Sequence, residues 1–365
     1  MTQTEALGPA IARASAFLKD QAAEGFPEAH HRMRFPRWAG FSSAQAEQVA
    51  TQFAPAVIAD LLLDVALCQD SAEAASWHEI ARAQADRLAQ ARLSDRPGGW
   101  SYFPDLPELP PDLDSLGAAI RLFARAAPEH LPLVEDPIRV ALAGAEPDGV
   151  LRTWIVAPDA PRKALKRMRR GVRWHWGDTV DLEVCARFFL GLYDMDAARF
   201  AAEIARASAA IAAAQAPDGS WPATWYAGPV YGTALCAQLM EVTGQDQAAE
   251  AGHAAMAACV HPDGGWGAWD SVPLDTAMAL AGLAPHVTVG VQDRAVAHLL
   301  RFQNPDGSWP GTPWIQMEAG RALGKIQRRI TWQSDTVTTA FALRALAIVA
   351  QQAEAEQAET ATPIP

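Results

Sequence analysis

One short motif, Pro-Asp-Gly-Ser-Trp, recurs along the chain and limits the possible folds more than any other feature. Complete or partial copies lie at residues 303–309, 215–221, 261–266, 96–100 and 146–149. Trp221, Trp266 and Trp309 therefore recur at a spacing of about 45 residues, which is typical of stacked helical pairs. Pro and Gly favour a tight turn, over which the Trp can pack at the end of a helix. We interpret the motif as repeated scaffold rather than as a functional site.

Helical periodicity alternates along the chain between amphipathic segments and segments that are apolar on nearly every side. The amphipathic segments predict outer helices with one face in water; they begin near Pro9, Ala74, Asp136, Ala198, Asp246 and Asp293. The apolar segments predict buried inner helices; they begin near Thr51, Ser115, Asp178, Tyr231, Asp275 and Asp335. These six pairs predict an all-α fold, an (α/α)6 toroid over residues 1–350, followed by a flexible C-terminal tail over residues 351–365.

The connections from outer to inner helices are long and rich in Gly, Pro and Trp, whereas the return connections are short. The long connections span residues 25–50, 94–114, 145–177, 216–230, 260–274 and 304–334. Because neighbouring helices are antiparallel, all of these loops meet at one mouth of the ring, where we expect the functional site. Asp178, Asp275 and Asp335 are predicted to cap the inner helices that they begin.

The net charge, the cysteines and the apolar runs limit the partners and the cellular setting that fit this chain. The net charge of -12 argues against nucleic acid as a partner. Single cysteines stand in apolar helical contexts, which is typical of reduced thiols in a cytoplasmic protein; they are Cys68, Cys185, Cys236 and Cys259. Residues 1–20 have the pattern of an amphipathic helix rather than of a signal peptide, and no apolar run is long enough to span a membrane.

Residues 110–115, Pro-Pro-Asp-Leu-Asp-Ser, carry more carboxylate than the start of a helix needs. With Ser115 as the N-cap, Asp112 and Asp114 would project into the mouth from the preceding loop. Two carboxyl groups in a cavity of low dielectric repel each other, so one of them keeps its proton to an unusually high pH and can act as an acid. A second interpretation fits the spacing equally well: Asp114 caps the helix and Asp112 is solvated.

The repeats resemble the QW motifs of the squalene-hopene and oxidosqualene cyclases, and the related prenyltransferase repeats, over nearly the whole chain. Gly98-Gly99-Trp100 followed by residues 111–114 is similar to the segment that leads into the acid motif, Asp-x-Asp-Asp-Thr-Ala, of class II terpene cyclases. In that family the middle Asp protonates an alkene or an epoxide. The resemblance assigns this role to Asp114 and makes Asp112 the first Asp of the motif.

The chain departs from that family in two respects. Ser115 replaces the third Asp, and Leu116-Gly117 replaces Thr-Ala, which removes part of the network that tunes the acid. Hopene cyclases and plant class II cyclases use two helical barrels with the site between them, whereas this chain has residues for one. Protein prenyltransferase beta subunits are single rings, but the Asp-x-Cys and the distant His that hold their zinc are not recognisable here.

Two further groups of residues are candidates for binding a substrate at the mouth. Basic side chains suit a diphosphate, a carboxylate or an acidic partner, although a solvated basic face is the commoner case. They are Arg162, Lys163, Lys166, Arg167, Arg169, Arg170 and Arg173, with Arg321, Lys325, Arg328 and Arg329. The second group offers aromatic faces that stabilise a cation and a His that tunes a carboxylate. It comprises Trp174, His175, Trp176, Asp178 and Trp332.

The leading hypothesis is a terpene cyclase-like enzyme that performs acid-initiated cyclisation or isomerisation of an isoprenoid of the squalene or prenyl diphosphate type. Asp114 would be the general acid, Asp112 would tune it, and Trp side chains would stabilise carbocations. One alternative is a non-catalytic toroid that binds an isoprenoid or a lipid. Another is a carbohydrate-active toroid that uses Asp112 or Asp114 with Asp178 or Asp335.

The expected partner is an apolar isoprenoid; a peripheral membrane contact that collects substrate and a homo-oligomer are both compatible with it. No cofactor is expected other than Mg²⁺ that accompanies a diphosphate substrate. No catalytic metal is predicted, because His30-His31 lacks a convincing set of carboxylate or Cys partners.

Overall fold

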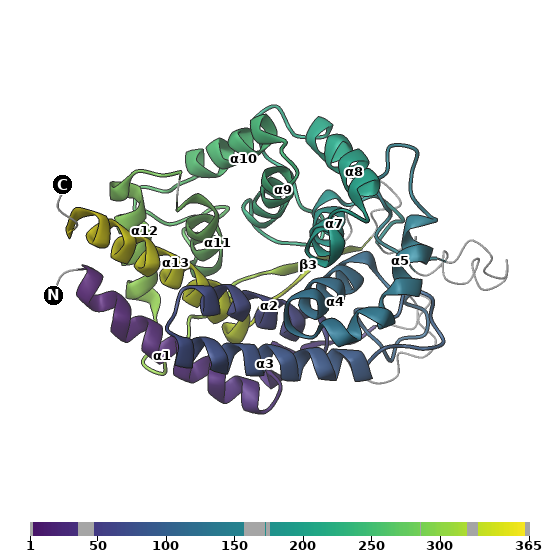
Figure 1. Ribbon diagram of the computed structural model, residues 1–365, viewed down its shortest axis with the longest axis horizontal. Coiled ribbons are helices and arrows are strands. Elements are labelled where there is room, and N and C mark those ends of the chain that lie inside the picture. The colour runs from purple at the N-terminus through teal and green to yellow at the C-terminus, as the bar shows by residue number, and fades with distance from the viewer. Residues whose placement is uncertain are drawn as a thin grey trace.

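Helices account for most of the described chain (Figure 1). The structure is a computed structural model that describes residues 3–35, 47–156, 172, 176–284, 286–319 and 328–361. The apolar segments form α2 (Phe53–Leu67), α4 (Leu113–Ala126), α7 (Leu182–Asp196), α9 (Tyr231–Val242), α11 (Pro273–Leu283) and α13 (Asp335–Ala361). The amphipathic segments form α1 (Gln3–Ala23), α3 (Ser71–Gln90), α5 (Glu135–Leu142), α8 (Ala201–Ala213), α10 (Asp246–Ala258) and α12 (Val289–Phe302). Each predicted helix is therefore present, and each begins within a turn or two of its predicted start.

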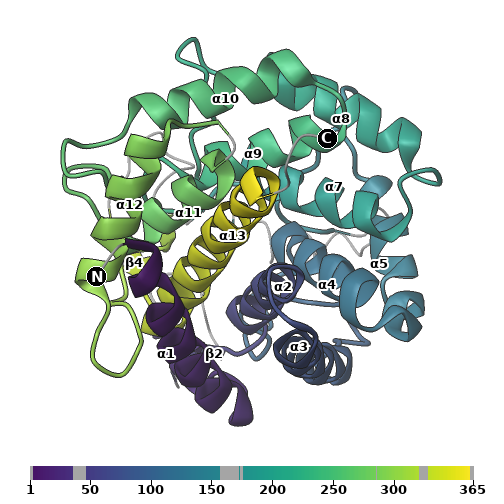
Figure 2. The same ribbon diagram turned by 60° about the vertical axis from the view of Figure 1, so that its left-hand side comes forward.

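The helices of the apolar segments lie side by side, and the amphipathic helices surround them (Figure 2). Each of α2, α4, α7, α9, α11 and α13 contacts the next one in chain order, and α13 also contacts α2. Burial follows this arrangement, because α2 is buried along nearly its whole length while α3 buries a single stripe that includes Trp77, Ala81 and Leu88. Removal of these apolar side chains from water is the main force that holds such a packing together.

The repeated motif fastens the ends of outer helices, as predicted. The indole Nε1 of Trp221 donates to the Ile211 carbonyl at 2.8 Å, and that of Trp309 donates to the Leu299 carbonyl at 2.7 Å. Trp266 repeats this contact with its own preceding helix, donating to the Met256 carbonyl at 2.7 Å. The interpretation of the motif as scaffold is confirmed, since these Trp side chains are buried and engaged with the backbone.

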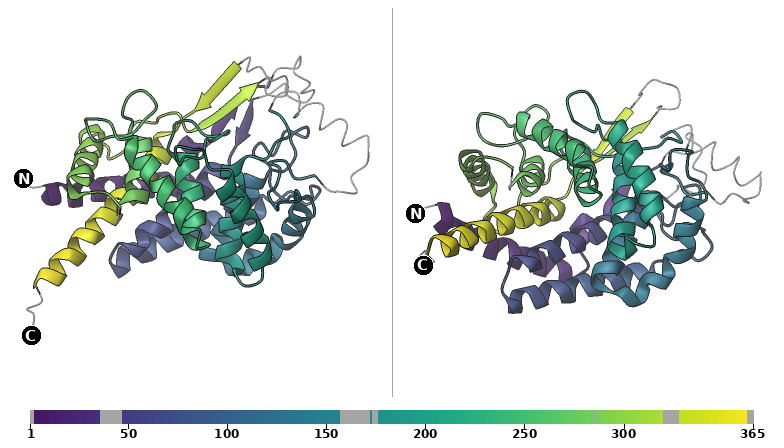
Figure 3. Two further views of the ribbon diagram at one scale, coloured as in Figure 1. Left: turned by 90° about the horizontal axis from the view of Figure 1, so that it is seen from above. Right: turned by 45° about the horizontal axis from the view of Figure 1, so that its top comes forward.

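Two short antiparallel hairpins add strands that the all-α prediction left out. The first pairs β1 (His31–Met33) with β2 (Gln48–Ala50), and the second pairs β3 (Ile315–Ala319) with β4 (Arg328–Trp332). In Figure 3 the strands lie together at one side of the helical body. The backbone of a long connection needs hydrogen-bond partners wherever water is excluded, and pairing into strands supplies them. The fold is therefore mostly helical rather than all-α.

The predicted caps of three inner helices are wrong. Asp335 is the first residue of α13, and the Ser334 hydroxyl, one position earlier, accepts from the Val337 backbone N–H at 3.1 Å. Asp178 lies before the start of α7, whose N-cap position is Asp181. Asp275 lies inside α11, because Pro273 begins that helix with its backbone dihedral already set for helical geometry. The structure thus frees Asp178 from the helix start and buries Asp275 in the first turn.

The beginning and the end of the described chain are joined at the start of α13. Glu28, in the 3-10 helix η1 (Pro27–Ala29), accepts hydrogen bonds from the backbone N–H groups of Asp335 and Thr336 at 3.0 and 2.9 Å. The helix α13 continues to Ala361, through much of the segment predicted to form a tail. None of the described helices combines the length and the apolar character that crossing a membrane requires.

Candidate active site

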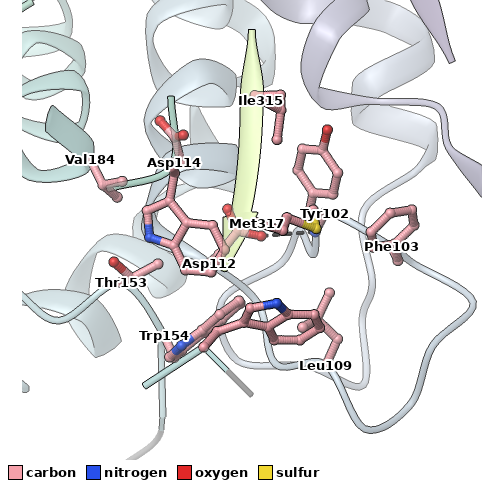
Figure 4. A pocket seen from close by; sticks show the side chains of 12 residues that line it. Tyr102, Phe103, Leu109, Asp112, Asp114, Thr153, Trp154, Val184, Ile315 and Met317 are labelled. Atoms are coloured by element: carbon pink, nitrogen blue, oxygen red, sulfur yellow. Dashed lines mark hydrogen bonds between the residues drawn. The ribbon is translucent and has the colours of Figure 1, made fainter. Parts of the chain in front are cut away.

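A pocket lies where the long loops meet the first residues of α4 and α7. It encloses about 470 Å³ of empty space, including the part that is open to solvent. Its lining includes the carboxyl groups of Asp112 and Asp114 and the hydroxyl group of Thr153. The rest of the lining is apolar or aromatic (Figure 4). The remaining lining residues are Tyr102, Phe103, Leu109, Trp154, Trp176, Val184, Trp225, Ile315 and Met317.

Asp112, rather than Ser115, is the N-cap of α4. Its Oδ1 accepts from the Ser115 backbone N–H at 2.7 Å, and its Oδ2 accepts from the Tyr102 backbone N–H at 2.8 Å and from the Ser115 hydroxyl at 3.0 Å. Burial raises the pKa of Asp112 to about 7, although the hydrogen bonds from Ser115 and Tyr102 act in the opposite direction. The nearby Asp114 carboxyl raises this pKa further. Neither interpretation of the capping residue was correct, because Asp112 has both the capping role and a place in the pocket.

Asp114 lies in the first turn of α4 and is held by two partners from distant parts of the chain. The Tyr226 hydroxyl donates to its Oδ2, and the Arg187 Nε lies 2.8 Å from its Oδ1. Burial raises the pKa of Asp114, and this effect outweighs the opposing effects of Arg187 and Tyr226. The structure therefore brings two carboxyl groups with raised pKa values to the wall of one mostly apolar pocket.

Arg187 extends from α7 and is buried between Asp114 and a second cavity. Its guanidinium lies over the rings of Phe53 and Tyr231, with its central carbon 5.4 and 5.7 Å from their centroids. The second cavity, which Arg187 lines together with Asp60, has about 1010 Å³ of empty space including its open part. Because these contacts stabilise the cation as well, Arg187 does not depend on Asp114 alone for its charge balance.

Three Trp rings form one wall of the pocket. The Trp154 and Trp225 centroids are 5.5 Å apart with an edge-to-face angle of 88°, and Trp176 lies 6.1 Å from Trp154 and 6.4 Å from Trp225. Asp181 fixes the position of Trp225, since its Oδ2 accepts from the Trp225 indole at 2.8 Å. The Trp154 indole donates to the Gly177 carbonyl at 3.0 Å. The donors of these two rings are occupied, so both rings are held in place at the pocket wall.

The substrate-binding residues predicted from the sequence divide into three groups. Trp176 lines the pocket. Asp178, Arg328 and Trp332 do not line it: Asp178 lies beside Arg152, Arg328 is exposed on β4, and Trp332 stacks on His31 with centroids 5.0 Å apart. The other predicted residues lie outside the described part of the chain; they are Arg169, Arg170, Arg173, Trp174 and His175.

Several residues of the pocket escaped the sequence analysis, and one pattern in the repeats could have found some of them. Trp225 follows the Trp of a repeat motif by a few residues, and Trp154 follows the copy at 146–149, which has no Trp of its own. Trp314 follows Trp309 in the same way and is buried, although it does not line the pocket. In these copies the second aromatic residue turns inward, whereas Trp269, which follows the copy at 261–266, is exposed. Nothing comparable marks Arg187, which is one of the Arg residues within the helical segments.

No protein-family model matches the chain. Drimenyl diphosphate synthase from Streptomyces showdoensis is 28% identical over 244 residues, which are 63% of this chain and 41% of that protein. A variant of the type II terpene cyclase MstE from Scytonema, in complex with its substrate geranylgeranyl dihydroxybenzoate, has a TM-score of 0.70 at 20% identity, covering 95% of this chain and 98% of that one. The chain has a class II terpene cyclase-like fold.

A third similar protein is longer than this chain. The structure of ent-copalyl diphosphate synthase from Streptomyces platensis has a TM-score of 0.54 at 25% identity, covering 82% of this chain and 50% of that one. The chain thus matches less than half of the drimenyl diphosphate synthase and half of this structure, but nearly all of MstE. The predicted resemblance to class II terpene cyclases is confirmed at the level of the fold, and the predicted helical architecture is confirmed as a mostly helical fold.

Proposed function

We propose that the chain is an enzyme that starts the cyclisation or isomerisation of an isoprenoid by proton transfer from Asp114. The observation that carries this proposal is the pairing of Asp112 and Asp114, two buried carboxyl groups with raised pKa values, at the wall of an aromatic pocket. A buried carboxyl group whose pKa is raised and which faces an apolar pocket is suited to protonate an alkene.

The chemical step needs only groups that line or support this pocket. The carboxyl O–H of Asp114 breaks, its proton forms a C–H bond with one carbon of a terminal alkene, and the other alkene carbon becomes a carbocation. Arg187 and the Tyr226 hydroxyl stabilise the carboxylate that remains on Asp114. The faces of Trp154, Trp176 and Trp225 are suited to stabilise the positive charge as rings close, and loss of a proton from carbon ends the reaction.

A polyprenyl chain with a terminal alkene is the substrate class that we propose. The names of the similar proteins support it, because two of them are synthases of terpenoid diphosphates, drimenyl and ent-copalyl diphosphate, and the substrate of the third is geranylgeranyl dihydroxybenzoate. A diphosphate end group would need cations, for which we propose Arg169, Arg170 and Arg173, with Mg²⁺ entering together with the substrate. Trp174 and His175 are proposed to complete the aromatic wall.

Incubation of the purified protein with farnesyl and geranylgeranyl diphosphate, a geranylgeranyl-substituted dihydroxybenzoate and squalene tests this function. Products are extracted, dephosphorylated where necessary and identified by gas or liquid chromatography with mass spectrometry. We expect a cyclised or isomerised product from at least one prenyl substrate. Absence of turnover with all four substrates, by a folded protein and with Mg²⁺ present, contradicts the enzymatic proposal and favours the non-catalytic isoprenoid binder.

The rate of the reaction should depend on pH through Asp112. Below about pH 7 Asp112 is neutral, because burial raises its pKa to about 7. Above that pH its negative charge opposes the formation of a second carboxylate on Asp114. We therefore expect kcat/KM to fall as the pH rises through about 7. Asp112→Asn keeps a good N-cap but cannot titrate, so its pH profile should lack this descending limb. An identical limb in this variant excludes Asp112 as its source.

The carbohydrate-active alternative has less support. It requires Asp178 or Asp335 opposite Asp112 or Asp114 across an open polar groove. Neither Asp178 nor Asp335 lines the pocket, and the pocket is mostly apolar. For the architecture we propose a single six-hairpin toroid over residues 1–350, which the contacts of α13 with both α11 and α2 support.

A further inference from the structure

Away from the pocket, three side chains with metal-ligating groups converge from three consecutive parts of the fold. Glu241 is on α9, His253 is on α10, and His286 follows α11; these helices are neighbours in Figure 1. The Nε2 atoms of His253 and His286 lie 3.0 and 3.8 Å from the same oxygen, Oε1 of Glu241. The two imidazole rings are stacked, with centroids 4.2 Å apart and an angle of 20° between their planes.

The spacing of these donors is close to that of a bound ion. One donor atom from each residue lies within 4.8 Å of the others. Donors around a tetrahedral zinc ion stand roughly 3.3 Å apart, given zinc–nitrogen distances of about 2.0 to 2.1 Å. Glu241 and His286 are exposed, so small rotations of their side chains can close the remaining gap, whereas His253 is buried and fixed. Two imidazoles and a carboxylate form a donor set that zinc and similar divalent ions prefer.

The surroundings leave the carboxylate available and the site accessible. Within the described part of the chain, Glu241 has no Arg or Lys partner, and its ion-pair contacts are with the two His residues. Glu241 and His253 also line the second cavity, so an ion bound to them would lie at the cavity wall. Three protein ligands leave a position of a tetrahedral ion open to water or to a ligand that enters this cavity.

A second group of possible ligands in the described chain is less suitable. Asp86, Glu129 and His130 also lie close together, but they offer a single imidazole. Glu129 is already paired with Arg82, whose charge would oppose a cation. This group therefore provides a matched control, because it has the same kinds of side chain without the second His.

We propose that Glu241, His253 and His286 bind a divalent transition-metal ion of the zinc type at the wall of the second cavity. The ion would join α9, α10 and the segment after α11. It would thereby raise the thermal stability of the folded chain, since an ion that binds the folded state stabilises it. This site does not involve Asp112 or Asp114, so it stands independently of the proposed enzymatic function.

Zinc binding to tag-free protein tests the proposal. Isothermal titration with Zn²⁺ is done in a Cys259→Ser background, because Cys259 is an exposed thiol that could bind zinc itself. We expect saturable binding of one equivalent and a higher melting temperature. His286→Ala and Glu241→Gln, at exposed positions, should each weaken binding at least about tenfold, since loss of even an outer-shell partner commonly costs that much. Co²⁺ bound to the same site should show visible d–d absorption that disappears in these variants.

The control variant His130→Ala should bind zinc as the parent does. Absence of saturable binding in the parent overturns the proposal. It is equally overturned if His130→Ala loses binding while His286→Ala retains it, because the ion would then occupy the other group. His253→Ala is a weaker test on its own, because His253 is buried and its removal also affects packing. The two exposed variants therefore decide the outcome even if that variant is unstable.

Discussion

Replacing Asp114 with Asn is expected to lower the turnover of the accepted prenyl substrate by about a hundredfold to ten-thousandfold, the usual contribution of a general acid. Asn has the shape of the neutral carboxyl group but no acidic proton to give to the alkene. The measurement is kcat and kcat/KM for wild type and variant. Asp105→Asn is the matched control, because Asp105 is an exposed residue of the same long loop and should leave turnover unchanged.

The stability of Asp114→Asn tests the protonation state on which this role depends. If the resting carboxyl carries its proton, Asn replaces a neutral group and the free energy of unfolding changes little. If Asp114 instead rests as the ionised partner of Arg187, removing its charge leaves a buried cation and costs about 3 to 5 kcal/mol. Thermal or urea unfolding distinguishes the two cases. Unchanged turnover, or a loss of turnover that simply follows unfolding, contradicts the role of Asp114 as the acid.

The helical architecture was predictable because its causes are local. The repeated turn motif fixes where outer helices end, and the difference between amphipathic and uniformly apolar segments separates outer from inner helices. Both signals lie within a few residues of the elements that they determine. The strands β3 and β4 were missed because their pairing depends on partners elsewhere, such as the Trp225 carbonyl, which accepts from the Gln316 N–H at 2.8 Å.

The candidate site was predictable only in part, for a related reason. The surplus of carboxylate at Asp112 and Asp114 was visible in the sequence, and both residues line the pocket. Their electrostatic environment was not visible, because Tyr226 is separated from Asp114 by 112 positions. The identity of the N-cap was uncertain because Asp and Ser both suit that position. Only the fold shows that Asp112 accepts hydrogen bonds from both sides of its loop.

Arg187 is a positioning residue whose replacement by Met should also have a large effect on the rate. Its Nε lies 2.8 Å from Asp114 Oδ1, where negative charge develops as the proton leaves. Removal of one such donor from a developing anion commonly lowers kcat by about a hundredfold to a thousandfold. We expect a loss of that size for Arg187→Met. Arg187→Lys keeps the charge but not the planar guanidinium, so it should restore part of the rate.

The pH profile separates this role from a merely structural one. Without the cation, the carboxylate form of Asp114 is less stable, so the pKa of Asp114 rises. The descending limb of kcat/KM belongs to the coupled pair of carboxyl groups, and it should move to higher pH. Arg139→Met, at an exposed position on α5, should change neither the rate nor the limb. A slower Arg187→Met enzyme whose limb stays in place contradicts electrostatic support of the acid, because a packing defect lowers the rate without moving the titration of the carboxyl pair.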